Sequence, residues 1–287
     1  MGAQDQERRT PSGVRLRRVS TGEGRWNWLF VPGGPGLGSE SVRGLARAAR
    51  VPGTAWLVDL PGDGSNRGAP QVPDRPYDRW PDVLTEAAQA LDDVVMVGHS
   101  TGGMFMLAVP GLEQHLAGMV LVSSAPHAGW REAFGRWAGT HPLPGADAAA
   151  GAYDRDPNDE TLRALTLASA AWNFTPEGLA EGRAVLEGLT YCHAAVAWAG
   201  THFDDVYRAR WKPESLPTLI ISGGRDHVVD QRLWQQDAAF DRPHVLRRTI
   251  DGASHFPWIE APHRVGAAFA DLIRLLDDAP RRPPVLR

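Results

Sequence analysis

Runs of apolar residues, separated by turns of small and polar residues, dominate the first half of the chain. Val14–Val19 alternates between apolar residues and arginines as an edge strand does. Longer apolar runs predict buried strands over Trp26–Val31, Thr54–Leu60, Val94–Val97 and Gly118–Ser123. Helical spacing predicts a helix from Ser39, as its cap, to Arg50 and another over Tyr77–Leu91. Strands that alternate with helices indicate βαβ units and a parallel sheet.

The pattern changes between about His127 and Lys212, where no strand-like run occurs. The helical segments there carry aromatic residues: Trp130, Phe134, Trp137, Trp172, Phe174, Trp198, Phe203 and Trp211. The sheet then resumes, with strands expected over Thr218–Ser222 and His244–Ile250 and helices near Asp230–Ala239 and over Pro262–Leu276. This order predicts a helical insertion between two halves of one sheet.

We therefore predict an α/β protein with a mostly parallel, doubly wound sheet. Its expected parts are a disordered tail (1–12), a core built from residues 13–126 and 213–277, a helical insertion (127–212) and a loose tail (278–287). Five arginines lie between Arg8 and Arg18. We interpret them as the solvated face of a tail and an edge strand rather than as a nucleic-acid patch.

Composition and charge limit the classes of function that the protein can have. The chain has 287 residues and a formal net charge of −4, so no global positive field attracts nucleic acid or an anionic membrane. The first 20 residues are polar and rich in arginine, and no run reaches the length of a membrane span. We expect a cytoplasmic protein that acts on a small molecule. Whether it is a monomer or a homo-oligomer stays open.

A single cysteine, Cys192, excludes an intramolecular disulfide and any site that needs several cysteines. We expect it to be a small buried apolar residue. No histidine and carboxylate spacing indicates a metal site, so neither a metal nor a cofactor is expected.

The motif Gly98-x-Ser100-x-Gly102 stands at the centre of the chain's chemistry. It follows the apolar run Val94–Val97 and leads into another, Met104–Val109. A strand, a sharp turn and a helix are the context in which such a motif exposes a serine hydroxyl above the edge of a sheet. Ser100 is therefore the candidate nucleophile.

A serine nucleophile needs a base, a carboxylate that orients the base, and N–H donors for the developing oxyanion. Ser100, Asp226 and His255 each follow a predicted strand, and ligands collect at the carboxyl ends of parallel strands. Their order along the chain, serine, aspartate and histidine, is the order of the α/β-hydrolase arrangement.

Five segments in one order make the resemblance specific. They are Gly33–Gly36, Asp59–Gly64, Gly98–Gly102, Gly224–Asp226 and His255–Glu260. The chain resembles an α/β-hydrolase of the proline-iminopeptidase-like and esterase branch over roughly residues 14–276. The resemblance implies that the backbone N–H groups of Gly34 and Thr101 form the oxyanion hole. One such donor is worth roughly 3 to 4 kcal/mol in a transition state.

Two positions depart from that pattern. Pro32 stands where the family usually has histidine, and it removes an imidazole and a backbone N–H from the loop. Pro61 replaces the arginine common in proline iminopeptidases and is like many esterases. The second departure weakens an aminopeptidase assignment.

Other histidines and carboxylates compete for the catalytic roles. His99 is interpreted as a packing residue, and the remaining alternatives as surface groups or parts of a pocket: His193, His202, His227, Asp204, Asp205 and Asp230. The resemblance implies that the insertion is a cap over the nucleophile. Its tryptophans Trp130, Trp172 and Trp198 are candidates for a pocket, and the alternative is that they hold the cap on the core.

The first hypothesis is a serine hydrolase that cleaves a small apolar or aromatic ester, thioester or amide through an acyl-enzyme on Ser100. Three alternatives stay open: a proline-iminopeptidase-like aminopeptidase, a biosynthetic lyase, cyclase or carbon–carbon hydrolase with the same three residues, and a non-catalytic ligand-binding protein. An aminopeptidase needs a cap carboxylate for the substrate amine, for which Glu177, Glu181, Asp204 and Asp205 are available.

Overall fold

The structure is a computed structural model that describes residues 7–279 of the chain. Eight strands form one sheet in the order β1-β2-β4-β3-β5-β6-β7-β8. The strands are β1 (Glu7–Arg9), β2 (Arg15–Thr21), β3 (Asn27–Val31), β4 (Thr54–Asp59), β5 (Val94–His99), β6 (Gly118–Val122), β7 (Thr218–Gly223) and β8 (Val245–Ile250). β1 and β2 are antiparallel to their neighbours, and all other pairs are parallel. The predicted mostly parallel α/β sheet is confirmed.

The N-terminal edge of the sheet differs from the expectation. β2 is not an edge strand, because β1 pairs with it, Glu7 opposite Arg17 and Arg9 opposite Arg15. β1 thus occupies residues 7–9 of the tail expected over residues 1–12. Residues 1–6 and, of the expected C-terminal tail, residues 280–287 lie outside the described part of the chain.

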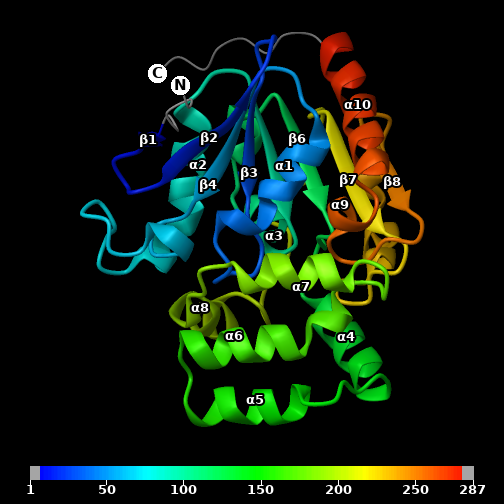
Figure 1. Cartoon of the computed structure of the whole chain (residues 1–287). Coiled ribbons are helices and arrows are strands. Elements are labelled where there is room, and N and C mark those ends of the chain that lie inside the picture. The colour runs from blue at the N-terminus through cyan, green and yellow to red at the C-terminus, as the bar shows by residue number, and fades with distance from the viewer. Residues whose placement is uncertain (1–6, 280–287) are drawn as a thin grey trace, which may run out of the picture.

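Alternate residues of the central strands pack on opposite faces of the sheet. Trp28 and Phe30 of β3 join the cluster that contains α1 (Arg43–Ala49) and α10 (Pro262–Asp278). Leu29 and Val31 join the cluster that contains α2 (Trp80–Gln89) and α3 (Thr101–Leu107). Figure 1 shows the sheet with helices on both of its faces. This two-sided burial is typical of parallel sheets and explains the continuous apolar runs in the sequence.

Several helices begin or end differently from their predicted bounds. The helix expected from Ser39 starts as the short 3-10 helix η1 (Ser39–Val42). Ser39 does not cap it, because Ser39 is the first residue of the helix and its hydroxyl oxygen accepts Arg17 Nη2 at 2.8 Å while its proton goes to Asp59. Similarly, the 3-10 helix η3 (Pro76–Arg79) precedes α2, and two 3-10 helices, η6 (Gln231–Gln236) and η7 (Ala238–Phe240), replace the helix expected near 230–239. Further short elements are η2 (Gly64–Asn66), η4 (Leu112–His115) and α9 (Pro257–Glu260).

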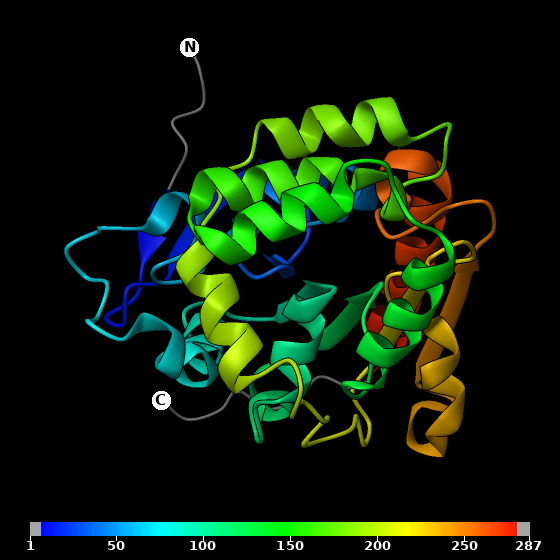
Figure 2. The same cartoon turned by 90° about the horizontal axis from the view of Figure 1, so that it is seen from below.

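The helical insertion, which we call the cap, lies between β6 and β7. It contains α4 (Gly129–Thr140), α5 (Ala146–Arg155), α6 (Asp159–Ala168), η5 (Ala170–Trp172), α7 (Leu179–Glu187) and α8 (His193–His202). The cap helices gather at one end of the sheet (Figure 1), and the view from below shows them bordering that end on three sides (Figure 2). The two connections to the core bond to each other, since the Ala128 N–H donates to Tyr207 O at 2.9 Å and the Ala209 N–H to Pro126 O at 2.8 Å.

Candidate active site

Ser100 stands at the turn between β5 and α3, with φ 50° and ψ −124°. A positive φ is uncommon for a residue other than glycine and marks a strained backbone. The Ser100 N–H donates to Val122 O of the neighbouring strand at 2.8 Å, which fixes the turn against the sheet. Ser100 is partly exposed, whereas the residues on either side of it are buried.

The two glycines of the motif are required by close backbone packing. A Cβ on Gly98 would lie 2.5 Å from Gly103 Cα, and a Cβ on Gly102 would lie 2.4 Å from Pro32 O. Real Cβ atoms do not tolerate either contact, so the turn can fold this tightly only with glycine at both positions. The strand, turn and helix predicted from the sequence are present.

His255 and Asp226 form a buried hydrogen-bonded pair. His255 Nδ1 lies 3.0 Å from Asp226 Oδ2, and the Asp226 side chain is fully buried. Asp226 Oδ1 accepts the N–H groups of Val228 and Val229, both at 3.0 Å, and Oδ2 also accepts Gln231 Nε2 at 3.4 Å. Every partner of this carboxylate is therefore an N–H donor. It follows that His255 Nδ1 carries a proton, so that in the neutral imidazole Nε2 is the acceptor nitrogen.

His99 links the histidine loop to the serine turn. Its Nε2 lies 3.1 Å from His255 O, and the centroids of the two rings are 4.9 Å apart. Burial lowers the pKa of His99 well below 6.5, and the charge of a protonated His255 would lower it further. A neutral His99 thus donates to the backbone of His255, consistent with its interpretation as a packing residue. Within residues 7–279, Ser100 Oγ itself has no hydrogen-bond partner.

Glu260 joins the histidine loop to the cap. Its carboxylate oxygens accept the backbone N–H groups of Ser254 in the loop and Thr175 in the cap. The cap also contacts the loop directly, because the His255 N–H donates to Asn173 O at 3.2 Å. The sequence placed Glu260 in the histidine segment but did not reveal this bridge, which depends on a contact 85 residues away along the chain.

The glycine loop, residues 33–38, abuts the serine turn from the other side. A Cβ on Gly33 would lie 2.8 Å from Ser100 Cβ, so the two backbones are in close contact. Thr101 Oγ1 donates to Gly34 O at 3.1 Å, and Gly34 has a φ of 113°. Neither the Gly34 N–H nor the Thr101 N–H donates a hydrogen bond to any residue in the described part of the chain. Both donors are therefore available to a ligand.

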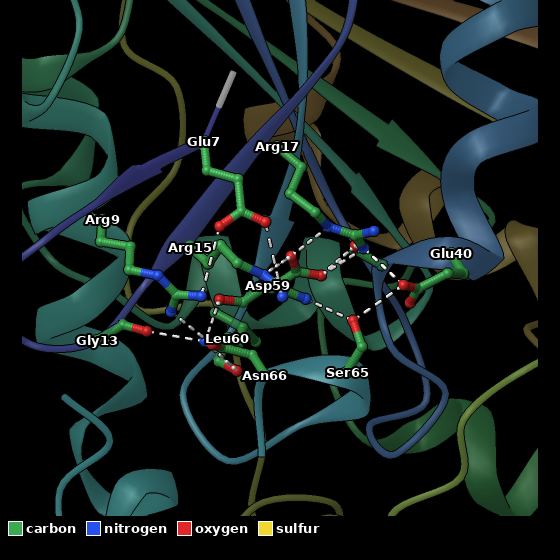
Figure 3. Close-up of polar contacts among 11 residues, drawn as sticks. Glu7, Arg9, Gly13, Arg15, Arg17, Glu40, Asp59, Leu60, Ser65 and Asn66 are labelled. Atoms are coloured by element: carbon green, nitrogen blue, oxygen red, sulfur yellow. Dashed lines mark hydrogen bonds and ion pairs between the residues drawn. The ribbon is translucent and has the colours of Figure 1, made fainter. Parts of the chain in front are cut away.

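An ion-pair network anchors the far end of the glycine loop (Figure 3). Asp59, at the end of β4, accepts Arg15 Nε at 2.8 Å, Arg17 Nε at 2.6 Å and the Ser39 hydroxyl. Arg17 also contacts Glu40 Oε1 at 2.7 Å. Burial lowers the pKa of Arg17, but pairing with Asp59 raises it above its usual value overall. Two of the five N-terminal arginines are thus structural, which corrects their interpretation as a solvated face.

The three candidate pocket tryptophans have different surroundings. Trp198 packs on the core, 5.5 Å from the ring of Trp80, and its Nε1 donates to Asp78 at 2.9 Å. Trp130 packs in a small cluster with Met104 of α3. Trp172 precedes Asn173 by one residue, and its Nε1 donates to His141 O at 2.9 Å. Trp172 therefore lies beside the segment that touches His255, whereas Trp198 holds the cap on the core.

The competing histidines and carboxylates have partners elsewhere. His227 stacks on Trp137 with a centroid distance of 4.5 Å, and Asp204 and Asp205 both pair with Arg131. Asp230 accepts the Arg232 N–H at 3.0 Å, and Asp159 accepts the His193 N–H at 2.8 Å. His202 is exposed at the end of α8, where its Nδ1 lies 3.1 Å from Trp198 O. Among residues 7–279, no three histidine, cysteine or acidic side chains are grouped so as to hold a metal ion. No helix in the same range is both long and apolar enough to span a bilayer.

A cavity of about 750 Å³ lies beside β7 and β8. Trp137, Asp226 and His227 line it, but neither Ser100 nor His255 does. The cavity is lined by Asp226 but not by Ser100. It is therefore not the place where a group that reacts with the Ser100 hydroxyl would bind.

Two bacterial esterases are similar to this chain over most of its length. A pimeloyl-[acyl-carrier protein] methyl ester esterase from Xylella fastidiosa is 28% identical over 240 residues, which cover 81% of this chain and 89% of that protein. A protein of the same name from Xanthomonas oryzae is 27% identical over 231 residues, 74% of this chain and 81% of that protein.

Two solved structures share the fold. A proline iminopeptidase-related protein from Thermus thermophilus has a TM-score of 0.70 at 22% identity, covering 96% of this chain and 99% of the other. A thermophilic esterase from Thermogutta terrifontis has a TM-score of 0.67 at 20% identity, covering 94% and 99%. The sequence profile described as "Alpha/beta hydrolase family" matches residues 28–268, and the chain belongs to that family.

Proposed function

We propose that this protein is a serine hydrolase that forms an acyl-enzyme on Ser100 from a small ester, thioester or amide. The observation that carries the proposal is the buried His255–Asp226 pair, joined through His99 to a strained serine at the same end of the sheet. Fold alone does not fix a function, so the proposal rests on this site and not on the family.

The proposed reaction assigns one role to each group. His255 Nε2 takes the Ser100 proton as Oγ attacks the carbonyl carbon, and the N–H groups of Gly34 and Thr101 stabilise the oxyanion. The tetrahedral intermediate then expels the alcohol, thiol or amine, which receives the proton from His255. Water next attacks the acyl-enzyme, again with His255 as base, and releases the acid and free Ser100.

The contact between Ser100 Oγ and His255 Nε2 is the link that this proposal adds. Such hydrogen bonds are often long or poorly aligned before substrate binds and tighten in the complex. Asp226 supports the role of His255. Its bond to Nδ1 keeps the proton on that nitrogen, so that Nε2 is the nitrogen that can accept a proton from Ser100.

The relatives support an ester as the substrate. The names of the two bacterial relatives describe methyl ester esterases, and one structural neighbour is an esterase. The cap carboxylates do not favour an aminopeptidase. Asp204 and Asp205 are tied to Arg131, and Glu177 and Glu181 are exposed. The aromatic residues near Trp172 support an apolar or aromatic acyl group.

Fluorophosphonate labelling tests the proposal. Intact wild type should take up one adduct, Ser100→Ala should take up none, and Ser20→Ala should label like wild type, since Ser20 is exposed on β2. A screen of short-chain esters, thioesters and amino-acid anilides then identifies the leaving group. Equal labelling of Ser100→Ala would remove Ser100 as the nucleophile. Labelling without turnover of any substrate in the screen would instead favour carbon–carbon cleavage, lyase chemistry or ligand binding.

A further inference from the structure

A second carboxylate of the β4 turn, Asp63, lies against the glycine loop. It is 2% exposed and lies between two glycines of the turn that follows β4. Its Oδ1 accepts the Gly64 N–H at 2.7 Å within its own turn, and its Oδ2 accepts the Gly36 N–H of the glycine loop at 3.3 Å. Both oxygens of this buried side chain are thus directed at backbone N–H groups of two different segments.

The two segments are also in direct backbone contact. A Cβ on Gly64 would lie 2.5 Å from Gly38 Cα, so nothing larger than glycine fits between them. On its other side, Gly36 O accepts the Cys192 N–H of the cap at 2.9 Å, and a Cβ on Gly36 would lie 2.7 Å from Cys192 O. Gly36 is therefore held on two sides: its N–H bonds to Asp63 and its carbonyl oxygen bonds to the start of α8.

We infer that Asp63 is a positioning residue that holds the glycine loop, through the Gly36 N–H, in the shape that the proposed oxyanion hole requires. The inference rests on the proposed function, because the loop matters to catalysis only if Gly34 stabilises an oxyanion. Asp63 contacts neither Ser100 nor His255 in the described structure and acts through the backbone of the loop.

Only an ionised carboxylate provides this arrangement fully. An asparagine offers one acceptor oxygen, which the Gly64 N–H would occupy, and its amide group would face the Gly36 N–H as a second donor. Protonation of Asp63 has the same effect, because the protonated oxygen becomes a donor. The hold on the loop should therefore weaken when Asp63 is neutral.

The surroundings of Asp63 place its titration in an accessible range. Burial raises its pKa to about 6, the N–H groups that it accepts lower it, Asp59 raises it and Arg67 lowers it. Two further titratable groups face this pocket: Tyr77, whose hydroxyl donates to Gly62 O at 3.0 Å, and Cys192, whose sulfur lies 3.4 Å from the Tyr77 hydroxyl. Burial raises the pKa of Tyr77, so it stays neutral in this range.

The way in which Asp63 affects the stability of the folded protein distinguishes a positioning role from a purely structural one. Because the folded pKa is raised from 3.8 to about 6, the folded protein binds this proton more tightly than the unfolded chain. The contribution of Asp63 to stability is therefore full below pH 3.8 and is lost as the pH rises through 6. At neutral pH, removal of this buried charge should offset the loss of the Gly36 bond, so a neutral replacement should change the melting temperature little.

The experiment compares wild type, Asp63→Asn and the control Asp82→Asn on the best ester of the screen. The Asp82 side chain is 70% exposed, and within residues 7–279 it pairs only with Arg79. We expect Asp63→Asn to lower kcat between about 10-fold and 100-fold, as a slightly misplaced group does, with KM and the melting temperature little changed. In wild type, kcat/KM should fall as Asp63 takes up its proton near pH 6, and this step should be absent from the pH profile of the variant.

Each outcome decides the inference. An Asp63→Asn enzyme with wild-type kcat and a wild-type pH profile would overturn it while leaving the serine hydrolase intact. A wild type that neither labels nor hydrolyses would remove the proposed function and this inference with it. If the variant does not fold, the wild-type profile decides, since a kcat/KM that does not fall between pH 7 and pH 5 contradicts a role for ionised Asp63.

Discussion

The two sides of Ser100 are held by carboxylates in different ways. On the histidine side, Asp226 accepts four N–H donors, and Glu260 joins two backbone N–H groups. On the glycine-loop side, Asp63 accepts only two backbone N–H groups and lies near the negative Asp59. With only two donors, burial dominates at Asp63 and raises its pKa to about 6. The glycine-loop side of the site should therefore respond to pH.

Both sides also contact the cap, at different places. The start of α8 bonds to Gly36, and the segment before α7 bonds to His255 and Glu260. The cap is thus not only a cover, because its backbone completes the positioning of both loops. Variants on each side should separate loss of the base from loss of the loop shape.

The largest effect is expected for Asp226→Asn. An amide at this position presents a donor or a weaker acceptor to Nδ1 and favours the wrong histidine tautomer, so kcat/KM should fall about 10⁴-fold. Steady-state kinetics on the best ester measures this fall. Asp241→Asn serves as control, because Asp241 is exposed and pairs with Arg247. A loss below about 10-fold would show that another group orients His255.

Glu260→Gln should have the next largest effect. A glutamine keeps one acceptor oxygen and so loses either the Ser254 or the Thr175 N–H, which leaves one buried donor without its partner. We expect kcat to fall between about 10-fold and 100-fold and stability to fall by about 1 to 3 kcal/mol. Urea unfolding and ester kinetics measure the two effects. Glu132→Gln, in an exposed pair with Arg136, is the matched control, and equal behaviour of the two variants would contradict the bridge.

His99→Phe should have a smaller effect on activity that is accompanied by a pH signature. Phenylalanine keeps the packing against Phe256 and Trp258 but loses the hydrogen bond to His255 O, so kcat should fall a few-fold and stability by about 1 kcal/mol. Burial lowers the pKa of His99 in the folded protein. Below pH 6.5 the unfolded chain therefore binds a proton at this residue that the folded protein does not bind. This group therefore costs wild type up to about 1.4 kcal/mol per pH unit below 6.5.

The stability difference between wild type and His99→Phe should accordingly shrink below pH 6.5 and change sign in favour of the variant before pH 5 is reached. Urea unfolding at several pH values measures it. Using the difference between the two proteins removes the opposite contribution of Asp63, which both share. A difference that does not change with pH would mean that His99 is protonated in the folded protein.

The smallest effect on catalysis is expected for Trp198→Phe. The ring still packs on Trp80 and Phe105, and the lost bond to Asp78 lowers stability by about 1 kcal/mol. KM for aromatic esters should not change. Trp172→Phe is the comparison, because Trp172 lies beside the segment that touches His255. A changed KM for Trp198→Phe alone would return Trp198 to the substrate pocket.

Much of the fold followed from local patterns in the sequence. Continuous apolar runs predicted the parallel strands because both faces of such a sheet are buried, and the glycines around Ser100 predicted the sharp turn because only they allow backbones to touch there. The helix boundaries near Ser39 and near residues 230–239 differed from the predicted ones. At Ser39 the hydroxyl oxygen, which a helix cap would use as an acceptor, accepts the distant Arg17 guanidinium instead.

Short motifs and the periodicity of neighbouring side chains were enough to predict the order of the elements, the place of the insertion and the candidate catalytic residues. The folded structure was needed to show that Arg15 and Arg17 pair with Asp59, that Glu260 bonds to the cap, and that Asp63 accepts the Gly36 N–H. These contacts join residues from 27 to 85 positions apart, and a carboxylate's partners depend on which backbone N–H groups the folded chain brings to it. The local sequence pattern therefore does not predict which N–H groups a carboxylate will accept.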